Sequence, residues 1–72
     1  MDIEKLIKMA NQIGDFFEAN PNEEEAKKEI ASHLHKFWNS VMIKSIVTHV
    51  KDRQGAGLHP KVLDAIKQHI SL

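Results

Sequence analysis

The chain has 72 residues, enough for one domain spanning 1–72. A core of that size supplies only about 3–5 kcal/mol of net stability, so association with another protein would help. Ten Lys and Arg balance ten Asp and Glu, and this neutrality argues against nonspecific binding of nucleic acid, which depends on neutralising phosphates. The absence of cysteine excludes disulfides and cysteine-ligated metal or iron–sulfur sites. Charges interrupt every apolar run, so we expect no signal peptide, no membrane span and a cytoplasmic location.

The first predicted helix covers residues 2–19, with Asp2 as its N-cap. Apolar residues recur along it at helical spacing as far as Phe17. Met9 and Phe16 lie just beside this stripe and widen the apolar arc to roughly half the circumference, where a core-facing helix needs only about 100°. The helix is therefore expected to pack against two different surfaces.

The second and third predicted helices cover residues 22–38 and 40–53. Proline after Asn20 ends the first helix, and Asn22 is placed to cap the second, followed by three glutamates that suit a helix start. Asn39 is expected to end the second helix and cap the third.

A glycine-containing loop precedes the fourth predicted helix, residues 60–70. One glycine is expected to end the third helix in a left-handed conformation, and Pro60 suits the first helical position because it has no amide hydrogen to lose there. The prediction is an all-α fold, a compact bundle or orthogonal array of four short helices.

The predicted core follows one apolar stripe on each helix. Its members are Ile3, Leu6, Ile7, Ala10, Ile13, Phe17, Ile30, Leu34, Phe37, Ile43, Ile46, Val47, Val50, Val62, Leu63, Ile66 and Ile70.

We predict no catalytic, cofactor-binding or metal-binding residues in this chain. Five histidines raise the question of a metal site, but His33 and His35 are two residues apart and point to different faces of a helix, whereas a helical metal pair is spaced by four. No arrangement of nucleophile, base and orienting acid can be recognised either.

Five residues are candidates for contact with a partner: Met9, Asn11, Gln12, Phe16 and Trp38. Trp38 stands beside the main stripe, so it either closes the end of the core or anchors in a partner's pocket. The same two interpretations apply to Met9 and Phe16, while Asn11 and Gln12 can also be ordinary helix-surface residues.

Three segments together resemble a known family. They are LIKMANQIGDFF at residues 6–17, IASHL at 30–34 leading into Phe37-Trp38 and Met42, and GLHPKV at 57–62. In this order and spacing they are similar to the delta subunit of the soluble, NAD-dependent, molybdenum-containing formate dehydrogenase of bacteria. The chain departs from the family pattern at Asn39-Ser40, where the family usually has Asp-Pro, and at His59, where it tends to have Ser.

The resemblance implies a small non-catalytic subunit that binds the large catalytic subunit and supports assembly or stability of the complex. The molybdenum cofactor, iron–sulfur clusters, flavin and NAD then belong to the partner subunits, and none is bound by this chain. The alternative is a homodimeric helical structural or regulatory protein that self-associates through the same face. A DNA-binding module is disfavoured by neutrality and by the lack of a basic recognition helix.

Overall fold

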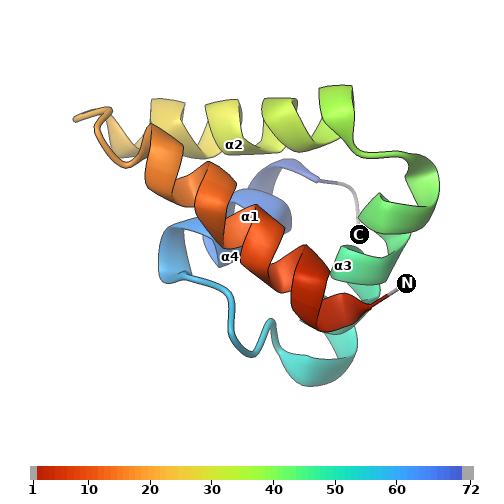
Figure 1. Ribbon diagram of the computed structural model, residues 1–72. Helices are drawn as coiled ribbons and strands as arrows, with labels where there is room; N and C mark the ends of the chain where they lie inside the picture. Colours follow the sequence, from red (N-terminus) through yellow and green to blue (C-terminus); the bar gives the residue numbers. More distant parts are fainter. Residues whose placement is uncertain (1, 71–72) are drawn as a thin grey trace.

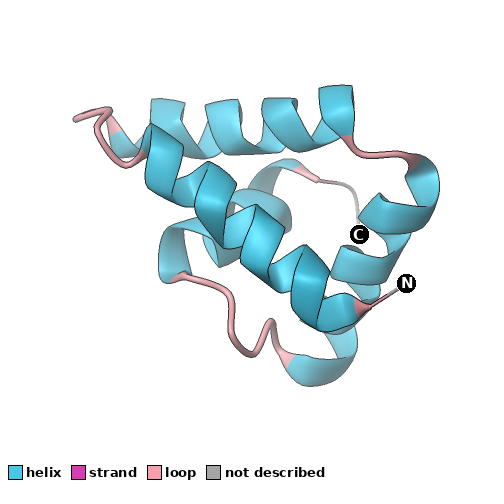
Figure 2. Ribbon diagram, in the orientation of Figure 1, coloured by secondary structure: helices cyan, strands magenta, loops and turns pink. Residues whose placement is uncertain are grey.

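The computed structural model describes residues 2–70, and this part of the chain forms four helices and no strand (Figure 2). They are α1 (Ile3–Phe17), α2 (Glu23–Phe37), α3 (Ser40–Arg53) and α4 (Pro60–His69). The predicted all-α fold is confirmed, and the helix ends differ from the predicted ones by at most two residues.

The helices form an array in which they cross, rather than a bundle with one common axis (Figure 1). A tight turn joins α1 and α2 at one end of the molecule, α3 lies at the opposite end, and α4 packs mainly on α2. None of these four helices is both long enough and apolar enough to cross a membrane.

Side-chain caps fix the starts of three helices. Asp2 accepts a hydrogen bond from the Glu4 amide at 3.0 Å, and Asn22 accepts one from the Glu25 amide at 3.0 Å. Asn39 accepts one from the Met42 amide at 2.9 Å. Each such cap is worth about 1 kcal/mol. The start of α4 relies instead on Pro60, since the side chain of the preceding residue makes no capping bond.

The end of α3 differs from the prediction. The residue with left-handed backbone at its C-cap is Gln54, with φ of 58°, and not a glycine. Gly55 follows with φ of 71°, and its amide returns to the His49 carbonyl at 3.3 Å. Two successive residues therefore have positive φ where the chain turns away from α3, and only one of them is a glycine.

The core forms between the inner faces of all four helices. Ten predicted members are buried: Leu6, Ala10, Ile30, Leu34, Ile46, Val47, Val50, Val62, Ile66 and Ile70. Six more pack against them while keeping part of their surface in solvent: Ile3, Ile7, Ile13, Phe17, Ile43 and Leu63. Buried residues outside the predicted set include Ala31, Leu58 and Ala65.

Phe37 was wrongly assigned to the core, because its side chain is 70% exposed. Helical spacing from Ile30 and Leu34 places it on the buried stripe, but α2 ends at this residue. Trp38 then takes up extended backbone, with ψ of 138°, and its side chain enters the core instead.

Candidate partner-binding groove

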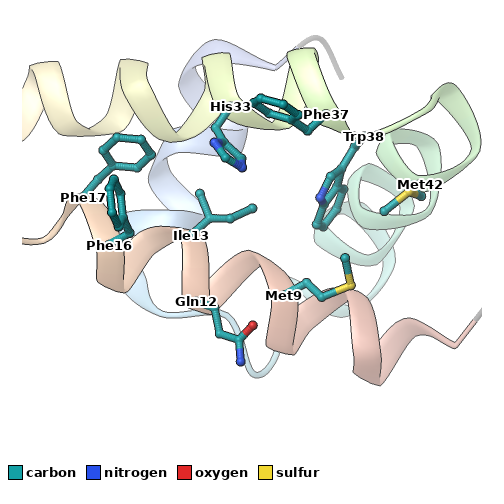
Figure 3. A pocket seen from close by; sticks show the side chains of 9 residues that line it. All are labelled: Met9, Gln12, Ile13, Phe16, Phe17, His33, Phe37, Trp38 and Met42. Carbon is teal, nitrogen blue, oxygen red and sulfur yellow. The ribbon is translucent and has the colours of Figure 1, made fainter.

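An open apolar groove lies where the middle of α1, the end of α2 and the start of α3 meet (Figure 3). Its volume is about 470 Å³. We call it the aromatic groove, and it is lined by Met9, Gln12, Ile13, Phe16, Phe17, His33, Phe37, Trp38 and Met42. Eight of these nine side chains are apolar or aromatic, so the groove suits an apolar occupant.

Three large hydrophobic side chains on this groove are exposed to solvent. Phe16 is 77% exposed, Phe37 70% and Met9 40%. Apolar surface gains about 25 cal/mol for each Å² removed from water, and soluble monomers rarely gather exposed apolar side chains on one surface. Covering these three side chains with an apolar surface of another molecule would therefore be favourable.

A line of ring contacts crosses the groove from α1 to α2. The Phe16 and Phe17 ring centres are 5.1 Å apart in an edge-to-face arrangement. Phe17 meets His33 at 6.2 Å, and His33 meets Phe37 at 4.6 Å. Aromatic pairs at these separations are worth about 0.5–1.5 kcal/mol beyond area burial, so these contacts favour the observed arrangement of the exposed rings.

Trp38 forms the floor of the groove. Only 8% of it is exposed, and it joins the buried cluster. Figure 3 shows its indole between Phe37 and the two methionines, Met9 and Met42. The structure therefore agrees with the interpretation in which Trp38 closes the end of the core. A partner could reach only the small exposed part of the Trp38 side chain.

Asn11 and Gln12 are adjacent in sequence but serve different surfaces. The Asn11 amide nitrogen donates to the Gly57 carbonyl at 2.9 Å, and its oxygen accepts from the His59 amide at 2.8 Å. Gln12 is exposed and lines the groove. Asn11 therefore holds the loop before α4, whereas Gln12 remains available to an occupant of the groove.

The comparisons with known proteins give one match. Residues 5–66 match the family of the NADH-dependent formate dehydrogenase delta subunit FdsD. The chain belongs to this family. All nine residues of the aromatic groove fall within the matched segment of this delta-subunit chain. Searches among curated proteins and among solved structures found no match.

Potential metal ligands were sought in the described part of the delta-subunit chain. Within residues 2–70 no three His, Asp or Glu side chains gather as potential metal ligands, and without cysteine the usual ligands of an iron–sulfur cluster are missing. His49 is used structurally, because its Nε2 donates to the Ala56 carbonyl at 2.7 Å.

Five residues of the groove were not predicted as partner contacts: Ile13, Phe17, Phe37, His33 and Met42, the first three having been assigned to the core. One local signal exists, because His33 and Phe37 are four residues apart and so lie on one face of a helix. Met42 carries no such signal. It reaches the groove only because the chain reverses at Trp38 and Asn39.

Proposed function

We propose that this chain is a non-catalytic accessory subunit that binds the large, molybdenum-containing subunit of a formate dehydrogenase in the cytoplasm. The observation that carries the proposal is the aromatic groove, where Met9, Phe16 and Phe37 are exposed together on one surface. Membership of the delta-subunit family supports a role within this enzyme complex.

The proposed role is to support assembly or stability of the complex. A protein that binds only the folded, cofactor-loaded form of its partner stabilises that form by mass action, by about 2.7 kcal/mol when its concentration is 100 times the dissociation constant. The molybdenum cofactor, iron–sulfur clusters, flavin and NAD are assigned to the partner subunits. In the proposed complex this chain contributes the apolar surface and the shape of its groove to the interface with the large subunit.

Co-purification tests the proposal. The tagged chain is expressed with the other formate dehydrogenase subunits of its native host, and we expect it to recover the large subunit in a fixed ratio. Recovery of none of these subunits, with the tagged chain itself folded, would contradict the proposal.

Phe16→Ala tests the groove, with Val41→Ala as the matched control. Phe16 lies in the groove, whereas Val41 is 60% exposed on α3 and does not line it. Truncating an apolar anchor at an interface costs about 2 kcal/mol or more, so Phe16→Ala is expected to weaken complex formation while Val41→Ala does not. Circular dichroism should show both variants to be as helical as the parent chain.

Self-association through the same groove is the second candidate, because two copies could cover each other's exposed rings. Light scattering on the isolated chain separates the two functions. A tight dimer that persists in the presence of the large subunit would favour the homodimer.

A further inference from the structure

The formally neutral chain is electrically polarised from one end to the other. Residues 15–29, which surround the α1–α2 turn, carry six carboxylates and two lysines, a net charge of −4. Residues 30–58, which include the end of α2 and all of α3, carry four basic side chains and one carboxylate, a net charge of +3. The α1–α2 turn and α3 lie at opposite ends of the molecule (Figure 1).

The aromatic groove runs between these ends. Phe16 and Phe17 lie toward the α1–α2 turn, while Trp38 and Met42 lie toward α3 (Figure 3). An occupant of the groove would therefore experience negative potential at one end and positive potential at the other.

Three exposed lysines lie close to the groove in sequence: Lys5, Lys8 and Lys36. Lys5 is one helical turn before Met9, and Lys8 is one turn before Gln12, so both share the groove face of α1. Lys36 on α2 lines a smaller hollow that shares Phe17, His33 and Phe37 with the groove and that Glu29 also lines. Among residues 2–70, none of these three ammonium groups has a carboxylate partner.

Three of the carboxylates near the turn already contact polar groups. Asp15 meets the His59 ring at 3.3 Å, and Glu18 meets Lys61 at 3.6 Å. The Asn20 amide donates to Glu29 at 3.3 Å. These three carboxylates therefore already have polar partners, whereas the ammonium groups of Lys5, Lys8 and Lys36 have no carboxylate partner among residues 2–70.

We propose that the aromatic groove receives an amphipathic helix of the large subunit whose apolar face is bordered by Asp or Glu at the end beside Lys5, Lys8 and Lys36. This rests on the proposed function and adds the chemistry and the direction of the docked segment. Helices commonly dock with their apolar face in such a groove, and methionines such as Met9 and Met42 adapt to the shape of the inserted side chains. Complementary charge sets orientation and association rate more than total affinity.

A charge reversal tests the proposal on the full complex. Lys5→Glu/Lys8→Glu is compared with Lys28→Glu/Lys67→Glu, which makes the same change in net charge at exposed lysines outside the groove. Both lysines are exposed, and Lys5 lies in the first turn of α1, where negative charge suits the helix dipole, so folding should be retained. Affinity for the large subunit is measured by biolayer interferometry at about 50 mM and about 500 mM salt, because screening separates charge effects from apolar ones.

We expect Lys5→Glu/Lys8→Glu to weaken binding by about tenfold or more at low salt, and the difference from the control pair to shrink at high salt. In the parent complex, a zero-length carbodiimide crosslinker should join Lys5, Lys8 or Lys36 to Asp or Glu of the large subunit. Equal affinities for the two double variants, or crosslinks only from lysines outside the groove, would overturn the proposal.

Phe16→Ala, measured in the same series, distinguishes this inference from the proposed function. If Phe16→Ala weakens binding and the α1 charge reversal has no more effect than its control, the groove binds the large subunit without an acidic border. If the parent chain does not bind the large subunit, the proposed function fails and this inference fails with it.

Discussion

Asn11 in the middle of α1 donates a hydrogen bond to the carbonyl of Gly57, 46 residues further along the chain, at 2.9 Å. The other atom of the same amide accepts from the His59 backbone at 2.8 Å. One side chain thus satisfies two backbone groups of the loop that leads into α4 and fixes that loop against α1. The buried side chain of Leu58 lies between these two anchored residues.

Asn11→Ala is expected to lower the free energy of unfolding by about 1–2 kcal/mol, because each lost hydrogen bond contributes about 0.5–1.5 kcal/mol. Urea denaturation measures the effect. Gln12→Ala is the matched control, since Gln12 neighbours Asn11 but is exposed in the groove, and its stability should change by less than about 0.5 kcal/mol. Equal stability of the two variants would show that the loop does not depend on Asn11.

The contrast between these neighbours indicates what the sequence can predict. Helix starts at Asp2, Asn22 and Asn39 were predicted because a cap and its amide partner are two or three residues apart. The role of Asn11 was not, because its partners lie in a loop distant in sequence and an interior helical Asn has no local pattern that reveals them.

The aromatic groove was also predicted only in part, because only some of its residues follow a local pattern in the sequence. Phe16 and Met9 stand out because helical spacing sets them beside the main stripe. Phe37 was placed in the core because it continues the helical stripe, but it is the last residue of α2 and its side chain lies in the open groove. Trp38 was placed beside the stripe because periodicity assumes that the helix continues, whereas α2 ends before it. Burial of Leu58 depends on the loop being held against α1. It could not be predicted, because a loop has no regular spacing of buried residues in its sequence.

Gly14→Ala is expected to destabilise the fold by about 1–3 kcal/mol, the usual cost of overpacking. Alanine in place of glycine within a helix normally stabilises by about 0.5–1 kcal/mol. Here, however, a Cβ on Gly14 would collide with a Val62 methyl group where α1 meets α4. Chemical denaturation shows whether Gly14→Ala raises or lowers the free energy of unfolding.

The double variant Gly14→Ala/Val62→Ala is the control for this collision. Removing the Val62 methyl groups should make room for the methyl group added to α1, so Gly14→Ala should cost less in the Val62→Ala background than in the parent. Independent effects that simply add would refute the close approach of α1 and α4.

The Glu24–Lys27 pair predicts a local pH dependence. The hydrogen bond from the Lys27 ammonium, 3.0 Å away, and then its charge lower the pKa of Glu24 below the ordinary value of 4.5. Because the folded-state pKa is the lower one, the stabilisation is present above pH 4.5 and is lost as the pH falls through the lowered pKa. In an NMR titration, Lys27→Met should raise the pKa of the Glu24 carboxyl, whereas Lys28→Met should leave it nearly unchanged.

Phe37→Ala and Leu34→Ala separate the groove from the core on a single helix. Leu34 is fully buried, so its truncation is expected to cost about 2–5 kcal/mol of stability. Phe37 is 70% exposed and its ring meets mainly His33, so its truncation should cost less than about 1 kcal/mol. Thermal and urea unfolding of the isolated chains measure both losses of stability.

Binding to the large subunit should show the opposite order: Phe37→Ala should weaken binding more than Leu34→Ala when the two variants are compared at equal folded concentration. The reason is that Phe37 lines the groove, whereas Leu34 is buried in the core. A large loss of stability in Phe37→Ala would mean that its ring belongs to the core after all.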